Sequence, residues 1–285
     1  TLPTVDAMRA FVPPKVSGLQ IFGGESGSTW TGQDCKFEWR RQAAYPFEFG
    51  AEQYGSGDGW QDENFRQIVY MDQDVDMTFG ATHEEPMTMV IKESVQSYRD
   101  LPVLLYQFQT KFRKELRAKS GLLRGREFRM KDLYSFHPDE KSHNEFYEQS
   151  AVAYGKVFER LGLDAYRIKA SGGIFSHEFS DEFQVICPTG EDEILVDNSD
   201  KTGYNKEVED QIPDGEKDKL ERVKAIEVGN IFHLGTKYAD AFELEYLDQK
   251  GERRKVYMGS YGIGITRLLG TLAEIYNDED GLKLP

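Results

Sequence analysis

Residues 110–136 read TKFRKELRAKSGLLRGREFRMKDLYSF. The last ten of them, Glu127–Phe136, alternate apolar and polar side chains as a strand with one covered face does. Just before this stretch, the apolar run Val103–Gln109 predicts a buried strand. The residues between the two runs are rich in lysine and arginine. We therefore expect two strands joined by a positively charged loop.

The loop stands out because the chain as a whole is acidic. Residues 111–131 hold nine cations and two acids, a net charge of +7, whereas the 285-residue chain carries −15. Arginine forks bind phosphate oxygens through paired hydrogen bonds. A cationic hairpin on an acidic protein fits the binding of a polyphosphate, and it equally fits a solvated charged surface. Charge alone leaves both open.

Helices are predicted on either side of this pair of strands. From Glu84 the apolar residues recur at spacings of three and four, and Pro102 should end that helix. A second helix is expected over residues 139–162, closed by Gly162. The inward positions are Met87, Val90, Ile91, Val95 and Tyr98 in the first helix, and Phe146, Ala151, Tyr154, Val157, Phe158 and Leu161 in the second.

The remaining pattern indicates an α+β fold, mainly an antiparallel sheet flanked by helices. Small residues pass into a helix within 261–276, and the polar residues 200–221 are interpreted as a solvated connection. In the glycine-rich first seventy residues, Pro13-Pro14 should break any early helix. Further strands are predicted at Ala165–Ile168, Phe183–Cys187, Ile194–Val196, Val223–Val228 and Ala241–Leu247.

Composition excludes several classes of protein. A net charge of −15 disfavours a bare tRNA-binding module, because nonspecific affinity for nucleic acid comes from phosphate neutralisation. No run approaches the ~20 apolar residues of a membrane-spanning helix, and no signal peptide is recognisable. Cys35 and Cys187 are too few for a disulfide framework. We expect a cytoplasmic protein.

Three stretches carry a resemblance to a known family. Residues 110–115, 121–128 and 259–267 (GSYGIGITR) resemble motifs 2 and 3 of the class II aminoacyl-tRNA synthetases. Within that class, residues 80–85, 125–136, 171–173 and 226–238 resemble the bacterial-type prolyl-tRNA synthetases, and the likeness covers residues 78–285. A dinucleotide-binding interpretation of Gly262 and Gly264 fails, because Arg267 stands where a third glycine is needed.

The resemblance implies an ATP-dependent ligase. Such a core joins proline to ATP as prolyl-adenylate and passes the prolyl group to the acceptor end of tRNA(Pro), with Mg²⁺ on the phosphates and a homodimer as the assembly. An alternative is a paralogue that binds ATP and an amino acid without charging tRNA. A threonyl-tRNA synthetase is a weaker rival, because Thr82-His83-Glu84 occupies the place of its zinc-binding cysteine.

Several residues of the two motifs would bind ATP by this resemblance. Arg113 and Arg267 would be catalytic and would lie on opposite sides of the nucleotide, Arg113 stabilising charge at the α-phosphate. Phe128 would stack on adenine, unless it is an ordinary core aromatic. The other implied contacts are Glu115 to the adenine amino group, Arg124 to the terminal phosphate, Glu227 to the ribose, and Gly264 with Gly262 beneath the nucleotide.

A second group would bind proline. Thr82 and Glu84 would hold its secondary ammonium, although Thr82 followed by Glu85 also fits a helix capping box. Alternation along one strand places Met130, Asp132 and Tyr134 on a single face, where the resemblance makes them walls of the proline pocket beside Arg113. His177 would complete the pocket, unless the register of residues 176–184 puts Asp181 in its place.

The chain also departs from the family pattern. We expect a single catalytic domain over residues 1–285, with a divergent motif 1 region at 1–77 that leaves the dimer interface in question. The stretch 200–221 would stand in place of the editing domain, so alanine should be mischarged to some extent. No anticodon-binding domain is recognisable in the sequence.

Overall fold

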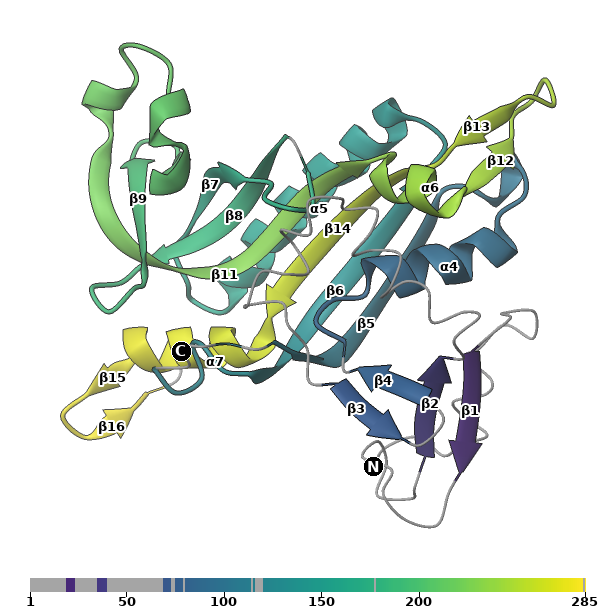
Figure 1. The fold of residues 1–285 in the computed structure, drawn as a ribbon. Coiled ribbons are helices and arrows are strands. Elements are labelled where there is room, and N and C mark those ends of the chain that lie inside the picture. Colours follow the sequence, from purple (N-terminus) through teal and green to yellow (C-terminus); the bar gives the residue numbers. More distant parts are fainter. Residues whose placement is uncertain are drawn as a thin grey trace.

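One large twisted sheet organises the molecule (Figure 1). The computed structural model describes the backbone of the strands at 19–23, 35–39, 69–72 and 75–78, and then residues 80–113, 115, 120–176, 178–283 and 285. The large sheet has eight strands in the order β5-β6-β14-β11-β8-β7-β10-β9. Each neighbouring pair is antiparallel except β7 and β10, which are parallel.

The predicted strands are present, most with longer bounds than expected, except that Ala241–Leu247 is a strand only in its last three residues and that the strand predicted at Phe183–Cys187 ends at Ile186. Small two-stranded sheets accompany the large one: β1 (Leu19–Gly23) with β2 (Cys35–Trp39), β3 (Val69–Asp72) with β4 (Val75–Thr78), β12 (Glu245–Leu247) with β13 (Arg253–Lys255), and β15 (Asn277–Asp278) with β16 (Gly281–Leu282). The large sheet contains β5 (Val103–Phe112), β6 (Glu127–His137), β7 (Ala165–Ser171), β8 (Phe179–Ile186), β9 (Asp192–Asp197), β10 (Thr202–Asn205), β11 (Glu221–Gly235) and β14 (Tyr257–Gly264).

Four α-helices and three short 3₁₀ turns appear in the described part of the chain. Helix α5 lies across the back of the sheet in Figure 1, and α7 continues directly from β14. The helices are α4 (Glu84–Ser94), α5 (Glu140–Arg160), α6 (Lys237–Phe242) and α7 (Ile265–Ile275), and the turns are η1 (Tyr98–Asp100), η2 (Lys206–Gln211) and η3 (Lys217–Lys219).

The two faces of the sheet are covered differently. On the face that we call the covered face, Tyr154 and Phe158 of α5 pack against Phe183, Ile231 and other buried side chains of the strands. On the opposite face, α4 and α6 form a second cluster with the strand ends, around Phe136 and Met258. We call this opposite face the site face, because the predicted binding residues lie on the part of it beyond that cluster.

The predicted buried strand at Val103–Gln109 is instead the edge strand β5. Its alternate side chains Leu104, Tyr106 and Phe108 are 45 %, 69 % and 57 % exposed. They share the covered face, but β5 lies at the edge of the sheet and α5 packs over the more central strands. The apolar run predicted the strand correctly and its burial wrongly, because burial depends on strand order.

The helices also differ from the predictions, in where α4 ends and in which residue of α5 faces outward. Helix α4 ends at Ser94, eight residues before Pro102, because Val95 is extended and a capping box of Ser97 and Asp100 opens a separate turn. In α5, Val157 is 38 % exposed rather than inward-facing. Gly162 does close α5, with a φ of +71° that favours glycine.

The connection at 200–221 is ordered rather than merely solvated. Strand β10 pairs with both β7 and β9, and Val208 in η2 is buried. The predicted strand at Ala241–Leu247 is also wrong in part, because α6 runs to Phe242 and only Glu245–Leu247 is extended.

Two further expectations concern regions with limited description. Pro13-Pro14 and most of the predicted motif 1 region lie outside the described residues. Among the helices that are described, none combines the length and apolar character needed to span a bilayer.

Candidate functional site

The register of the sheet brings the predicted site residues onto one face. Asp132 on β6 lies opposite Gln107 on β5 and Gly262 on β14, and Tyr134 lies opposite Ser260. Directly opposed residues of antiparallel strands share a face. Residues far apart in the chain therefore meet over the middle of β5, β6 and β14.

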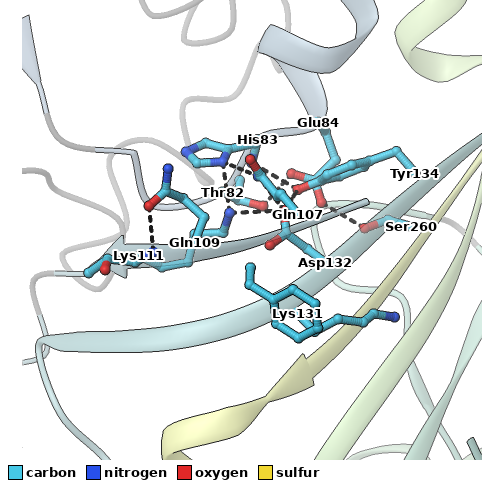
Figure 2. A network of polar contacts seen from close by, with 12 residues as sticks. Thr82, His83, Glu84, Gln107, Gln109, Lys111, Lys131, Asp132, Tyr134 and Ser260 are labelled. Carbon is cyan, nitrogen blue, oxygen red and sulfur yellow. Dashed lines mark hydrogen bonds and ion pairs between the residues drawn. The ribbon is translucent and has the colours of Figure 1, made fainter. Parts of the chain in front are cut away.

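Glu84, at the start of α4, is a buried carboxylate held by hydroxyl groups. Ser260 Oγ donates to its Oε1 at 2.9 Å, and Thr82 Oγ1 donates to its Oε2 (Figure 2). The side chain is 4 % exposed. The helix begins after His83 with no side-chain cap, so the capping-box interpretation of Thr82 is wrong. Thr82 orients the carboxylate instead.

Next to it lies a buried ion pair that the sequence analysis missed. Lys111 Nζ is 2.9 Å from Asp132 Oδ2, and the two side chains are 0 % and 3 % exposed. The same oxygen accepts from Gln107 Nε2 at 2.6 Å and from Tyr134 Oη at 2.8 Å. In the sequence, Lys111 is one of the nine cations of residues 111–131. Strand alternation, which puts Lys111 on the face of Gln107 and Gln109, was the signal that could have found it.

The positive charge of Arg267 acts on Arg113, the other predicted catalytic arginine. Arg113 donates through Nε to the carbonyl of Ala81 at 3.3 Å, and its guanidinium lies 5.2 Å from the centre of the Phe128 ring. Burial, and then the positive charge of Arg267, lower the pKa of Arg113. Phe128 is half-buried rather than part of a core cluster of the described residues, which weakens the alternative of an ordinary core aromatic.

Arg267 is fixed by strands and by the loop of residues 120–126. Its Nη1 is 2.8 Å from Glu227 Oε2, and its Nε donates to the carbonyl of Leu123 at 2.9 Å. Leu123 in turn packs beside Cys187 and Ile226. The start of α7 is thereby tied to the loop that follows β5.

Arg124 and Glu115, both predicted to meet ATP, contact each other. Arg124 Nε is 2.8 Å from Glu115 Oε2, and its Nη1 is 3.1 Å from Glu191 Oε2. Arg126 Nε donates to the backbone carbonyl of Glu115 at 2.9 Å. Any role of Arg124 at a terminal phosphate would require it to exchange these carboxylate partners.

Next to Arg267, the acidic side chains of Glu227 and Glu182 lie close together on the site face. Asn230 Nδ2 lies 3.4 Å from Glu182 Oε1 and 3.3 Å from Glu227 Oε1. Burial, and then the negative charge of Glu227, raise the pKa of Glu182 to about 8. Buried acceptors without a partner in the described residues include Asn230 Oδ1 and Gln184 Oε1. This arrangement suits a positive ligand.

Small residues of β14 make room beneath the site. A Cβ added to Gly262 would lie 3.4 Å from Met130 Sδ, so the thioether rests on this glycine. Gly264 caps α7 and lies against the Arg267 side chain, where an added Cβ would be 3.4 Å from Arg267 Cβ.

The ambiguous register of residues 176–184 is partly resolved. His177 lies outside the described residues. Asp181 points to the covered face, where its Oδ2 accepts from Tyr147 Oη at 2.9 Å and from Arg167 Nη2 at 2.7 Å. Asp181 therefore does not take the place of a pocket histidine.

Comparison with known proteins gives the family. Residues 67–276 match the family model described as the tRNA synthetase class II core domain (G, H, P, S and T). The chain belongs to this family. The predicted α+β fold and the resemblance inferred from the motifs are thereby confirmed.

Similar curated proteins are proline–tRNA ligases. That of Anaplasma phagocytophilum is 40 % identical over 228 residues, covering 74 % of this chain and 54 % of its own length. That of Maricaulis maris is 37 % identical over 260 residues, covering 81 % and 58 %. The chain thus spans about half the length of the curated relatives it matches.

Solved structures agree on the fold. Prolyl-tRNA synthetase of Giardia lamblia, in complex with prolyl-adenylate, superposes with a TM-score of 0.64 at 18 % identity, over 84 % of this chain and 42 % of that one. The enzyme from Cryptosporidium parvum, complexed with L-proline and AMP, gives a TM-score of 0.59 at 18 % identity, over 99 % of this chain and 54 % of that one.

Proposed function

We propose that this chain is the catalytic core of a proline–tRNA ligase. The observation that carries the proposal is the position of Glu84, a buried carboxylate oriented by two hydroxyl groups, whose charge acts on Arg113. An amino acid is a zwitterion, so its ammonium group needs a negatively charged partner and its carboxylate needs a positively charged one. The names of the relatives make proline the amino acid we propose.

Charge balance around Glu84 supports this role. Asp132 is already paired with Lys111. Burial, and then the charge of Glu84, raise the pKa of Glu85 to about 8, so Glu85 is mostly neutral at pH 7. A buried carboxylate is costly unless a positive group pairs with it. The secondary ammonium of proline would supply that positive charge at Glu84, within walls formed by Met130 and Tyr134.

In the first half-reaction, a carboxylate oxygen of proline attacks the α-phosphorus of ATP. The new bond joins that oxygen to phosphorus, and the bond from the α-phosphorus to the bridging oxygen breaks, so pyrophosphate leaves with the electron pair. Arg113 would stabilise the charge that grows on the α-phosphate oxygens, which is commonly the largest contribution to catalysis. Arg267 would hold the nucleotide from the other side, with Phe128 and Glu115 on the adenine.

Mg²⁺ fits the acidic side chains beyond Arg267. Glu182 and Glu227 share one amide donor from Asn230, whose own oxygen is unpartnered among the described residues. Two carboxylates plus phosphate oxygens and water are the usual environment of this ion. When bound, Mg²⁺ would neutralise charge on the leaving pyrophosphate.

The second half-reaction would transfer the prolyl group to tRNA(Pro). A ribose hydroxyl at the acceptor end would attack the prolyl carbonyl carbon, and AMP would leave. We propose that a homodimer in the cytoplasm performs both steps.

The decisive measurement is exchange of labelled pyrophosphate into ATP, tested across the amino acids. Proline-dependent exchange is expected, with alanine as the strongest competitor. Binding of ATP and proline without exchange would favour the inactive paralogue, and exchange that depends on threonine would favour the rival synthetase.

A further inference from the structure

His83 lies between the two residues proposed to bind the amine, yet its own side chain faces the buried ion pair. Lys111 Nζ lies 2.7 Å from His83 Nδ1, and Gln107 Nε2 is also within hydrogen-bonding distance of that nitrogen (Figure 2). An ammonium group only donates, so Nδ1 is the acceptor and the imidazole is neutral, with its proton on Nε2.

The donors that reach His83 are themselves held in place. Asp132 Oδ2 accepts from both Lys111 and Gln107, and Asp132 is 2 % exposed. Tyr134 Oη, which donates to the same oxygen, accepts from the backbone N–H of His83 at 3.2 Å. One carboxylate oxygen of β6 thus organises contacts to both the side chain and the backbone of His83.

The residues before His83 are fastened to the end of β5. The N–H of Phe112 donates to the carbonyl of Gly80 at 3.0 Å, and Arg113 reaches the carbonyl of Ala81. A Cβ on Gly80 would lie 2.3 Å from His83 Nε2, so the imidazole rests directly on the glycine. The position of the ring and the path of the backbone therefore depend on each other.

We propose that Lys111, Gln107 and His83 are positioning residues for the amine-binding carboxylate. Lys111 and Gln107, aligned by Asp132, hold the neutral imidazole of His83 and thereby fix the turn that presents Thr82 and Glu84 to the substrate. This inference rests on the proposed function, because it concerns the residues that bind the ammonium group of proline.

The electrostatics agree with this arrangement. Burial, and then the positive charge of Lys111, lower the pKa of His83 well below its ordinary value. Both effects favour the neutral ring, which keeps its acceptor nitrogen. Lys131, the neighbour of Asp132 on β6, points to the other side of the sheet and contacts Tyr154 Oη at 2.7 Å, so it takes no part.

The test compares two substitutions of His83 in the 285-residue chain by steady-state pyrophosphate exchange. His83→Leu removes the acceptor and should raise KM for proline at least ~10-fold, the effect of one lost orienting hydrogen bond to a charged group. KM for ATP should change less than ~2-fold by the same reasoning. His83→Asn places an amide oxygen near the position of Nδ1 and should restore most of the affinity for proline.

A second, matched pair of variants lies on β5. Gln107→Leu should raise KM for proline in the same way. Gln109→Leu, two residues along on the same face, should not, because the side-chain oxygen of Gln109 accepts from the backbone of Thr110 instead. This pair keeps the proposal testable if His83→Leu fails to fold in a thermal unfolding control.

Three results would overturn the proposal. They are an unchanged KM for proline in His83→Leu and Gln107→Leu, an equal rise in both KM values, and a His83→Asn variant no better than His83→Leu. If the unsubstituted chain shows no proline-dependent exchange, the proposed function itself fails and this inference falls with it.

Discussion

The two faces of the central sheet are built from the same strands but use their buried polar groups in opposite ways. On the covered face, His143 of α5 lies between His137 and His233 of the strands, and burial lowers the pKa of His143 to about 3 and of His137 to about 4. On the site face, burial raises the pKa of Glu85 and Glu182 to about 8. Burial thus favours the neutral form of these four groups, although the site face also holds the buried ion pair of Lys111 and Asp132.

The consequence of that neutrality differs. The histidines of the covered face are enclosed by aromatic rings, including Tyr147 stacked on His233 at 3.6 Å between centres. On the site face, Glu84 lies near Arg113, and Glu182 lies beside Asn230 and Gln184, whose side-chain oxygens have no partner in the described residues. There a substrate ammonium or a metal ion would restore the balance of charge. Buried polar groups therefore serve packing on one face and, in our proposal, binding on the other.

The largest expected effect is a loss of stability from the covered face. Phe158→Ala removes a fully buried ring from the main core and should lower the free energy of unfolding by about 3–5 kcal/mol. Urea unfolding would measure it. Val157→Ala, one residue earlier and 38 % exposed, is the control and should change stability by less than about 1 kcal/mol. Equal losses would refute the assignment of faces.

Arg113→Ala should show the reverse pattern on the site face. Proline-dependent exchange is expected to fall at least ~10²–10³-fold, about 3–4 kcal/mol in the transition state, because a fixed donor to the α-phosphate is lost. Urea unfolding should change less than in Phe158→Ala, since Arg113 belongs to neither of the two main apolar clusters of the described residues. A variant that keeps its exchange activity would contradict the catalytic assignment.

Lowering the pH should reduce the free energy of unfolding through the buried histidines of the covered face. The folded-state pKa of His143 lies below its unfolded value, so the folded state binds fewer protons between about pH 3 and 6.5, and stability is lost as the pH falls through that window. At pH 5 this one group should cost about 2 kcal/mol. His143→Gln should flatten the acid limb of a stability–pH curve, whereas an unchanged limb would show that other groups control it.

The smallest effect is expected from Glu182→Gln, with the opposite sign. A raised folded-state pKa means that stability falls as the pH rises from about 4.5 to 8. The amide should therefore raise the free energy of unfolding at pH 8, by roughly 1 kcal/mol after its weaker hydrogen bonds are considered. Exchange activity should drop at the same time, most clearly at low Mg²⁺. If Glu182→Gln instead lowers the free energy of unfolding at pH 8, the ionised Glu182 side chain does not destabilise the folded state as we expect.

The sequence pattern alone predicted several of the residues that lie on the site face and the family to which the chain belongs. Alternation in Glu127–Phe136 placed Met130, Asp132 and Tyr134 on one face, and the spacing of Arg113, Glu115 and Arg267 indicated the family. These inferences succeed because strand periodicity and short motifs depend on neighbours in the chain.

What the chain order could not reveal is which distant groups meet. Lys111 looked like one more loop cation, and only the pairing of β5 with β6 shows it buried against Asp132. The exposure of Tyr106 likewise follows from the place of β5 at the sheet edge. A side chain's charge and period are properties of the sequence, but its desolvation and partners are properties of the packed sheet, because both depend on residues brought near from elsewhere.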